Sequence, residues 1–421
     1  MPAAAGYEKA AAGLRVDDLQ VEWLDGLLPQ DAARLLRDEK LEMMISDNAL
    51  SMEMFRRAAA LSNDGRLLAQ ATEAPASAVP GPGYGPHLKL FRLLLLDARR
   101  KAASGQRRGA EVNLLAAAGF IAQLAEQKEA RLLSAVTLEF CLGRAYPYFA
   151  LSLRGNNPSP SYMADLAALL ARARAGLAAA PLAMKEEAEL GKAALRETVN
   201  PEKAALERGV MPFYKRYAYR RLENDDYFKR VYARFDAAAD ARAVALTEAF
   251  GANDPAAGEA FVKGQLAELA AKDTLKGRLG FVNGYKATVA EAHGVRSAMA
   301  DSAVNAFASA GSPEYWKLIS GYHAAASMLD VLRSALAVKE YQRRRRALPD
   351  GLARLVPAFL PEVPVDPFNK FAPLSYSPRG RSFTIHAFGP DGDDDGAAKV
   401  FDRSAFRAGE APPDGDIIYT D

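Results

Sequence analysis

The chain has 421 residues, half of them hydrophobic, so it can bury a sizeable core in one large domain or in two or three ordinary ones. Its 54 basic and 52 acidic residues nearly cancel, which excludes a global attraction to nucleic acid or to an anionic membrane. The single cysteine, Cys141, excludes an internal disulfide, and its apolar neighbours predict a small buried side chain.

Residues 1–15 precede the first periodic segment, and we expect them to form a flexible N-terminus. They contain no charged stretch followed by an apolar core, which is the pattern of a signal peptide. No later segment approaches the roughly 20 apolar residues that span a bilayer. Membrane association is therefore expected only through a segment absent from this chain.

Residues 16–341 predict an α-helical domain, because Ala, Leu, Glu, Lys and Arg dominate and Gly and Pro fall mainly between periodic segments. A long loop rich in Pro and Gly is expected at 72–86. No fixed repeat period occurs, so the pattern indicates a large multi-helix bundle or an irregular α-solenoid. The expected helices cover residues 16–28, 31–61, 87–103, 108–127, 129–153, 161–179, 181–199, 201–222, 225–250, 255–272, 273–308 and 313–341.

Aromatic and basic residues alternate between Met211 and Asp236, a combination that stacks bases and holds phosphates in some nucleic-acid-binding proteins. However, Phe228, Tyr232 and Phe235 fall at the spacing of one helix face, which favours a buried stripe beside solvated cations. We therefore expect no nucleic-acid partner. A cytoplasmic helical scaffold that binds protein or RNA through this face remains an alternative.

Signs of catalysis are sparse. The four histidines show no metal-ligand spacing, and neither a nucleophile elbow nor a phosphate-binding loop occurs. The sequence therefore favours a non-enzymatic protein. An enzyme with a site in a cleft of the helical domain, built from carboxylates that the sequence does not single out, is the second alternative.

Residues 342–421 have a different texture, with frequent prolines and short alternating strands at 374–377, 382–388 and 417–420. They predict a small α+β module with a short antiparallel sheet, so the chain as a whole is expected to be mainly α.

An acidic loop follows the second of these strands. Acidic side chains stand at the first, third, fifth and twelfth positions of a twelve-residue window, with Gly396 at the sixth, as in calcium loops of the EF-hand type. The preceding segment alternates like a strand, so a helix-loop-helix hand is not expected. A solvated acidic turn is the alternative. The predicted Ca²⁺ ligands are Asp391, Asp393, Asp395, the carbonyl of Ala397, and Asp402.

Short motifs follow one another after the helical domain: residues 335–341, Leu348-Pro349-Asp350-Gly351-Leu352, Leu355-Val356-Pro357, residues 363–368 with Asp366-Pro367-Phe368, Leu374-Ser375-Tyr376, Phe388-Gly389-Pro390-Asp391-Gly392 and Gly415-Asp416-Ile417. This order resembles the globular end of the major pseudopilins of type II secretion systems. The similarity covers about a fifth of the chain and looks closest to large bacterial envelope proteins that carry such a module behind a helical region.

The resemblance implies a helix, a proline-marked loop, a small antiparallel sheet and a calcium loop that also includes Asp414 and Asp416. A calcium site with few bidentate ligands binds weakly and fills only where calcium is near millimolar, which indicates an extracytoplasmic location in the periplasm or cell envelope. We therefore expect a secretion-associated protein with a helical domain that binds protein partners.

Overall fold

The computed structural model describes residues 3–27, 29–61, 84–127, 131–154, 158–178, 227–254, 315–402 and 414–421, with isolated positions between 181 and 264. The chain divides into two compact units. One contains Met1–Thr72, Pro80–Ala180 and Ser320–Asp421, and the other contains Glu73–Val79 and Pro181–Ile319. The predicted loop at 72–86 lies outside the described residues up to position 83.

The N-terminus is a helix, α1 (Ala3–Ala12), which packs against α5 (Ala49–Ala59). Tyr7 is fully buried, and its ring meets that of Phe55 edge-on at 4.9 Å between centroids. Ala3, Tyr7 and Ala10 recur every three or four residues, which gives α1 one apolar face. The prediction of a flexible segment at 1–15 is therefore wrong.

Short helices follow: α2 (Asp18–Asp25), α3 (Ala32–Arg37) and α4 (Glu39–Asp47). The single helix predicted at 31–61 is thus divided into α3, α4 and α5. Asp38 begins α4 by accepting a hydrogen bond of 3.0 Å from the Leu41 amide. Asn48 separates α4 from α5, and its buried side chain bonds the amide and the carbonyl of Arg15.

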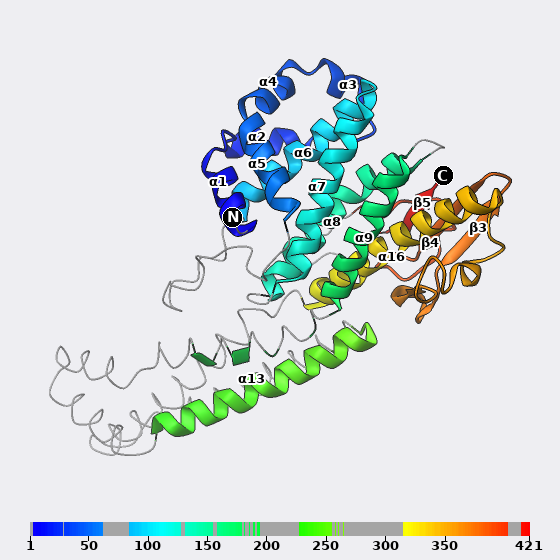
Figure 1. Ribbon diagram of the computed structural model, residues 1–421. Helices are drawn as coiled ribbons and strands as arrows, with labels where there is room; N and C mark the ends of the chain where they lie inside the picture. Colours follow the sequence, from blue (N-terminus) through cyan, green and yellow to red (C-terminus); the bar gives the residue numbers. More distant parts are fainter. Residues whose placement is uncertain are drawn as a thin grey trace, which may run out of the picture. The chain divides into compact units, whose positions relative to one another are not determined.

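Longer helices form the centre of this unit: α6 (Gly85–Ala103), α7 (Arg107–Ala125), α8 (Arg131–Leu153) and α9 (Pro160–Leu177). Helix α7 contacts all three of the others (Figure 1). Cys141 is buried in α8 as predicted. A Cβ added at Gly119 would lie 2.6 Å from the Ala59 carbonyl, so this glycine permits the close approach of α7 to the end of α5.

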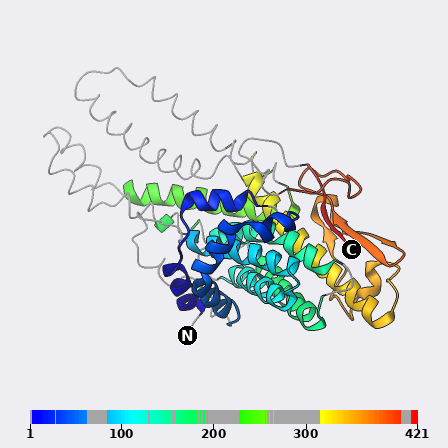
Figure 2. The same ribbon diagram turned by 90° about the horizontal axis from the view of Figure 1, so that it is seen from above.

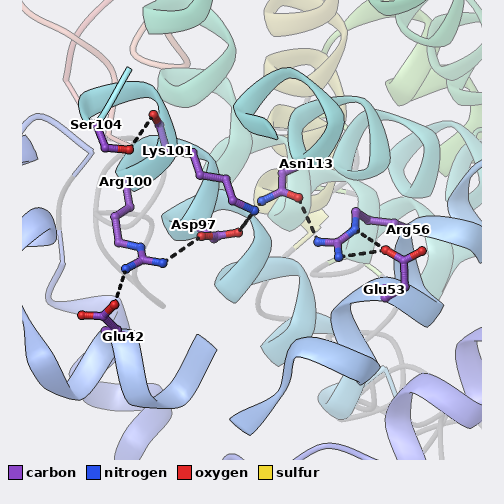
Figure 3. Close-up of polar contacts among 8 residues, drawn as sticks. All are labelled: Glu42, Glu53, Arg56, Asp97, Arg100, Lys101, Ser104 and Asn113. Carbon is purple, nitrogen blue, oxygen red and sulfur yellow. Dashed lines mark hydrogen bonds and ion pairs between the residues drawn. The ribbon is translucent and has the colours of Figure 1, made fainter. Parts of the chain in front are cut away.

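A polar network connects α4, α5, α6 and α7 (Figure 3). Its centre is the buried Asp97, which pairs with Lys101 at 2.5 Å and accepts a hydrogen bond of 2.8 Å from Asn113. Asn113 in turn accepts from Arg56, and Arg100 joins Asp97 to Glu42. Polar and charged groups therefore pair between these helices.

The second unit is described mainly through α13 (Tyr227–Ala252). Ala239, Ala243, Leu246 and Phe250 are buried on one face of this helix, at the spacing predicted for an amphipathic segment. Lys192 reaches it by an ion pair of 2.5 Å with Asp240. Most of the helices predicted between 181 and 308 lie outside the described residues.

The C-terminal module begins on α16 (Tyr315–Arg345) and continues through η2 (Leu352–Leu355), β1 (Val365–Asp366), η3 (Pro367–Asn369) and β2 (Ala372–Pro373). Three antiparallel strands follow in the order β3-β4-β5: β3 (Ser375–Arg379), β4 (Ser382–Ala387) and β5 (Ile417–Thr420). The predicted class, mainly α with a small antiparallel sheet, is confirmed.

The sheet lies beside α16 in both views (Figures 1 and 2). Lys339 on α16 forms an ion pair of 2.8 Å with Asp421, and its ammonium lies 6.0 Å from the ring centroid of Phe383 on β4. Helix α16 runs past the predicted boundary at 342, and both sides of that boundary belong to one compact unit. The boundary therefore marks a change of secondary structure only.

Among the described residues, none of the helices is both long and apolar enough to cross a bilayer.

Candidate metal centre

The acidic loop leaves the end of β4 and turns sharply. Gly392 and Gly396 have φ angles of 78° and 62°, in the left-handed region that glycine adopts without strain. The predicted reversal at Gly396 is therefore present. Asp366 fixes the start of the loop, because its buried carboxylate accepts hydrogen bonds from the amides of Phe388 at 2.7 Å and Phe368 at 2.9 Å.

Four carboxylates converge in this loop. Asp391, Asp393, Asp395 and Asp414 each offer an oxygen, and these oxygens all lie within 4.8 Å of one another. We call these four residues the acidic cluster. Three of its members follow β4, and the fourth precedes β5, so the acidic cluster joins the two ends of the β4–β5 connection.

The ammonium group of Lys399 contacts the acidic cluster. Lys399 pairs with Asp414 at 2.5 Å and lies 3.8 Å from Asp395. Its hydrogen bond lowers the pKa of Asp414. Burial raises the pKa of Asp391, and the neighbouring charge of Asp393 raises it further.

The acidic cluster contains oxygens that protein groups do not satisfy. Oδ2 of Asp391 accepts a hydrogen bond of 2.8 Å from the Gly415 amide. Oδ1 of Asp391 and Oδ2 of Asp395 are buried and have no hydrogen-bond partner among the described residues. Buried carboxylate oxygens without partners are unfavourable, and a bound cation would compensate them.

The predicted ligands separate into three sets. Asp391, Asp393, Asp395 and Asp414 lie together, as predicted, whereas Asp402 belongs to no acidic or histidine-containing group among the described residues. Asp416 belongs to a different group, described next. The amide of Ala397 donates a hydrogen bond of 2.8 Å to Asp416, and the role of the Ala397 carbonyl stays a prediction.

Asp402 is displaced because the second half of the loop pairs with the chain before β5. The Phe401 amide donates to the carbonyl of Asp416 at 2.8 Å, and the Asp416 amide donates to Lys399 at 3.0 Å. This bridge directs residues 399–401 along the sheet edge. Asp402 therefore lies outside both groups among the described residues, and its role as a ligand stays a prediction.

A second group was missed by sequence reasoning. His386 near the end of β4, Asp394 in the loop and Asp416 before β5 bring one ligand atom each within 4.8 Å of the others. His386 Nε2 lies 3.2 Å from Asp394 Oδ1. The available signal was the position of His386 at the end of one predicted strand and of Asp416 directly before the next.

Comparisons of this chain with protein-family models, with curated proteins and with solved structures give no match. The aromatic and basic segment at 211–236 lies outside the described residues up to position 226. The acidic cluster and its neighbouring histidine group are therefore the candidate sites that the described residues support.

Proposed function

We propose that this chain is a non-enzymatic, extracytoplasmic envelope or secretion-associated protein. Its C-terminal module, of the pseudopilin type, is stabilised by Ca²⁺, and its helical region binds a protein partner. The observation that carries the proposal is the convergence of Asp391, Asp393, Asp395 and Asp414 on one point.

The donor chemistry of the acidic cluster favours a hard divalent cation. Every donor is a carboxylate oxygen, and Lys399 balances only part of the negative charge. Calcium accepts six to eight oxygens in flexible geometry, so four carboxylates together with backbone carbonyls or waters suit it. Magnesium demands a stricter octahedron and releases its waters reluctantly, which makes it the weaker candidate.

A cation at the acidic cluster would connect the loop after β4 to the residue that precedes β5. Tyr419 on β5 bonds Leu153 of α8, and Asp421, directly after β5, bonds Lys339 of α16. The ion would therefore hold the strand that attaches the sheet to the helices. A ligand that binds only the folded state at a hundred times its Kd adds about 2.7 kcal/mol to the free energy of unfolding.

The extracytoplasmic location follows from the expected weakness of the site. The acidic cluster contains four of the six predicted carboxylates, and weak calcium sites fill only at near-millimolar calcium. A reporter that is active only outside the cytoplasm, fused to the C-terminus of the natural gene product, tests this part. A fusion protein that is present in the cytoplasmic fraction and shows no reporter activity would refute it.

The helical region is the part that we assign to partner binding. Leu19, Met43 and Leu50 lie on α2, α4 and α5 and expose 80%, 58% and 70% of their surface. These exposed apolar side chains favour a protein partner over a nucleic acid.

The calcium proposal is tested with the full chain after treatment with a chelator. We expect one equivalent of Ca²⁺ to bind in calorimetric titration and to raise the melting temperature. Asp393→Asn should weaken binding at least about ten-fold, since it removes a ligand charge. Asp402→Asn is the matched control and should leave binding unchanged. Absence of both heat and thermal shift in the wild type would remove the calcium proposal.

A further inference from the structure

The acidic loop has a second set of donors, with a chemistry that differs from that of the acidic cluster. His386, Asp394 and Asp416 combine one imidazole with two carboxylates. We propose that these three residues form a separate divalent-metal site, selective for a borderline transition metal such as Zn²⁺ over Ca²⁺. This inference does not depend on calcium binding at the acidic cluster.

The spacing of the donor atoms suits a small metal ion. Ligands about 2.0–2.1 Å from a tetrahedral zinc ion are separated from one another by about 3.3 Å. The distance between His386 Nε2 and Asp394 Oδ1 is 3.2 Å. One donor atom from each of the three residues lies within 4.8 Å of the others, so a small closure would bring all three into coordination distance.

Asp416 is the second, independent indication of a ligand. Its side chain is fully buried, and Oδ2 accepts the Ala397 amide hydrogen at 2.8 Å. Oδ1 is also buried and has no hydrogen-bond partner among the residues that the structure describes. A buried, ionised oxygen left unpaired is costly, and a metal ion at the donor group would compensate it.

The ring of His386 gives the same indication. It is mostly buried, and Nδ1 has no hydrogen-bond partner in the described part of the chain. In a neutral ring one nitrogen donates and the other accepts. A carboxylate accepts, so the bond to Asp394 makes Nε2 the donor and leaves Nδ1 as an acceptor without a donor among the described residues. Metal coordination at Nε2 requires that this nitrogen is unprotonated, which the neutral ring achieves by carrying its proton on Nδ1.

The third donor is held in place and faces solvent. Asp394 Oδ1 accepts the Gly396 amide hydrogen at 2.8 Å, which fixes the carboxylate in the turn. Its side chain is 48% exposed, so an ion can reach the group from solvent. Three protein ligands leave a fourth position for water in tetrahedral coordination.

The presence of an imidazole distinguishes this group from the acidic cluster. Calcium takes oxygen ligands, whereas imidazole nitrogen suits zinc and other late transition metals. One loop would then hold two different ions, with Asp394 directed to one site and its neighbours Asp393 and Asp395 to the other.

The test uses the full chain, freed of metal by a chelator and then saturated with Ca²⁺ so that the acidic cluster is occupied. Calorimetric titration with ZnCl₂ should show one further equivalent, and Co²⁺ in its place should give the visible absorption of a low-coordinate site. Asp394→Asn keeps an acceptor for the Gly396 amide and should weaken Zn²⁺ binding at least about ten-fold. His386→Gln should abolish the Co²⁺ spectrum.

Two controls separate a lost ligand from a lost fold. Ca²⁺ binding and the melting temperature in Ca²⁺ should stay unchanged in Asp394→Asn, whose side chain lies at the surface. Asp393→Asn should weaken Ca²⁺ binding and leave Zn²⁺ binding intact. Failure of the wild type to take up Zn²⁺, or uptake by Asp394→Asn and His386→Gln equal to that of the wild type, would overturn the proposal and assign the group to a histidine–carboxylate hydrogen bond.

Discussion

The hydroxyl of Tyr419 on the last strand donates a hydrogen bond of 3.1 Å to the carbonyl of Leu153 at the end of α8, 266 residues earlier in the chain. Both residues are fully buried. A second contact, the ion pair of 2.8 Å between Lys339 and Asp421, the residue directly after this strand, is also largely buried. Strand β5 thus attaches the sheet to two different helices of the same compact unit.

Replacement of Tyr419 by Phe keeps the ring and removes only the hydroxyl. We expect a loss of about 1–3 kcal/mol in the free energy of unfolding, because the carbonyl of Leu153 is left buried without its partner. Urea unfolding of the full chain measures this loss. Tyr376→Phe is the matched control, since its hydroxyl donates to the carbonyl of Pro349 at a partly buried site within the module. Equal effects of the two changes would contradict a special role for Tyr419.

The buried Asp97 supplies the second prediction (Figure 3). Asp97→Asn keeps the shape but leaves the Lys101 ammonium without its counter-ion at 2.5 Å. We expect a loss of about 1–3 kcal/mol in the free energy of unfolding, with the cost moderated by the partial exposure of Lys101. Glu53→Gln, at the exposed end of the same network, should cost no more than about 1 kcal/mol. Chemical denaturation of the two variants would contradict this account if Glu53→Gln proved the more damaging.

The third prediction concerns acid sensitivity at the end of α16. The hydrogen bond from Arg343 lowers the pKa of Glu340, and a second, weaker contribution in the same direction comes from the hydrogen bond of Arg344. A carboxylate whose pKa falls on folding contributes stability above its unfolded pKa and loses that contribution as the pH falls through the folded value. Wild type should therefore be slightly more stable than Glu340→Gln at pH 7, and the difference should vanish in acid. A difference that grew on acidification would contradict the assignment.

The helices were largely predictable, because apolar residues at intervals of three and four fix both the type of element and its buried face. The positions at which the helices begin and end were less predictable. The break at Asn48 depends on its bonds to Arg15, 33 residues away, and no local pattern contains that partner. The N-terminal helix was missed because its many alanines give little hydrophobic contrast between its faces, and its burial depends on tertiary packing against α5.

The acidic cluster was predictable in part. The spacing of Asp391, Asp393 and Asp395 around Gly396 placed three carboxylates correctly, because alternate residues of a tight turn face one side. The fourth, Asp414, came only from the family resemblance. The position of Asp402 depends on the bridge between Val400 and Asp416, a pairing that local spacing does not encode.

The last prediction concerns Lys399, whose ammonium occupies the side of the acidic cluster formed by Asp414 and Asp395. In Lys399→Gln the carboxylates lose their one neighbouring ammonium among the described residues, so their mutual repulsion increases in the absence of metal. The chain should therefore melt at a lower temperature without Ca²⁺. A bound Ca²⁺ would no longer compete with the ammonium, so calcium affinity should rise. The increase should be about two- to five-fold, because the ion pair between Lys399 and Asp414 is largely exposed.

Thermal melts and calorimetry on the chelator-treated full chain measure both effects, with Lys370→Gln as the charge-matched control. A fall in calcium affinity in Lys399→Gln would show that the lysine supports the site instead of competing for it.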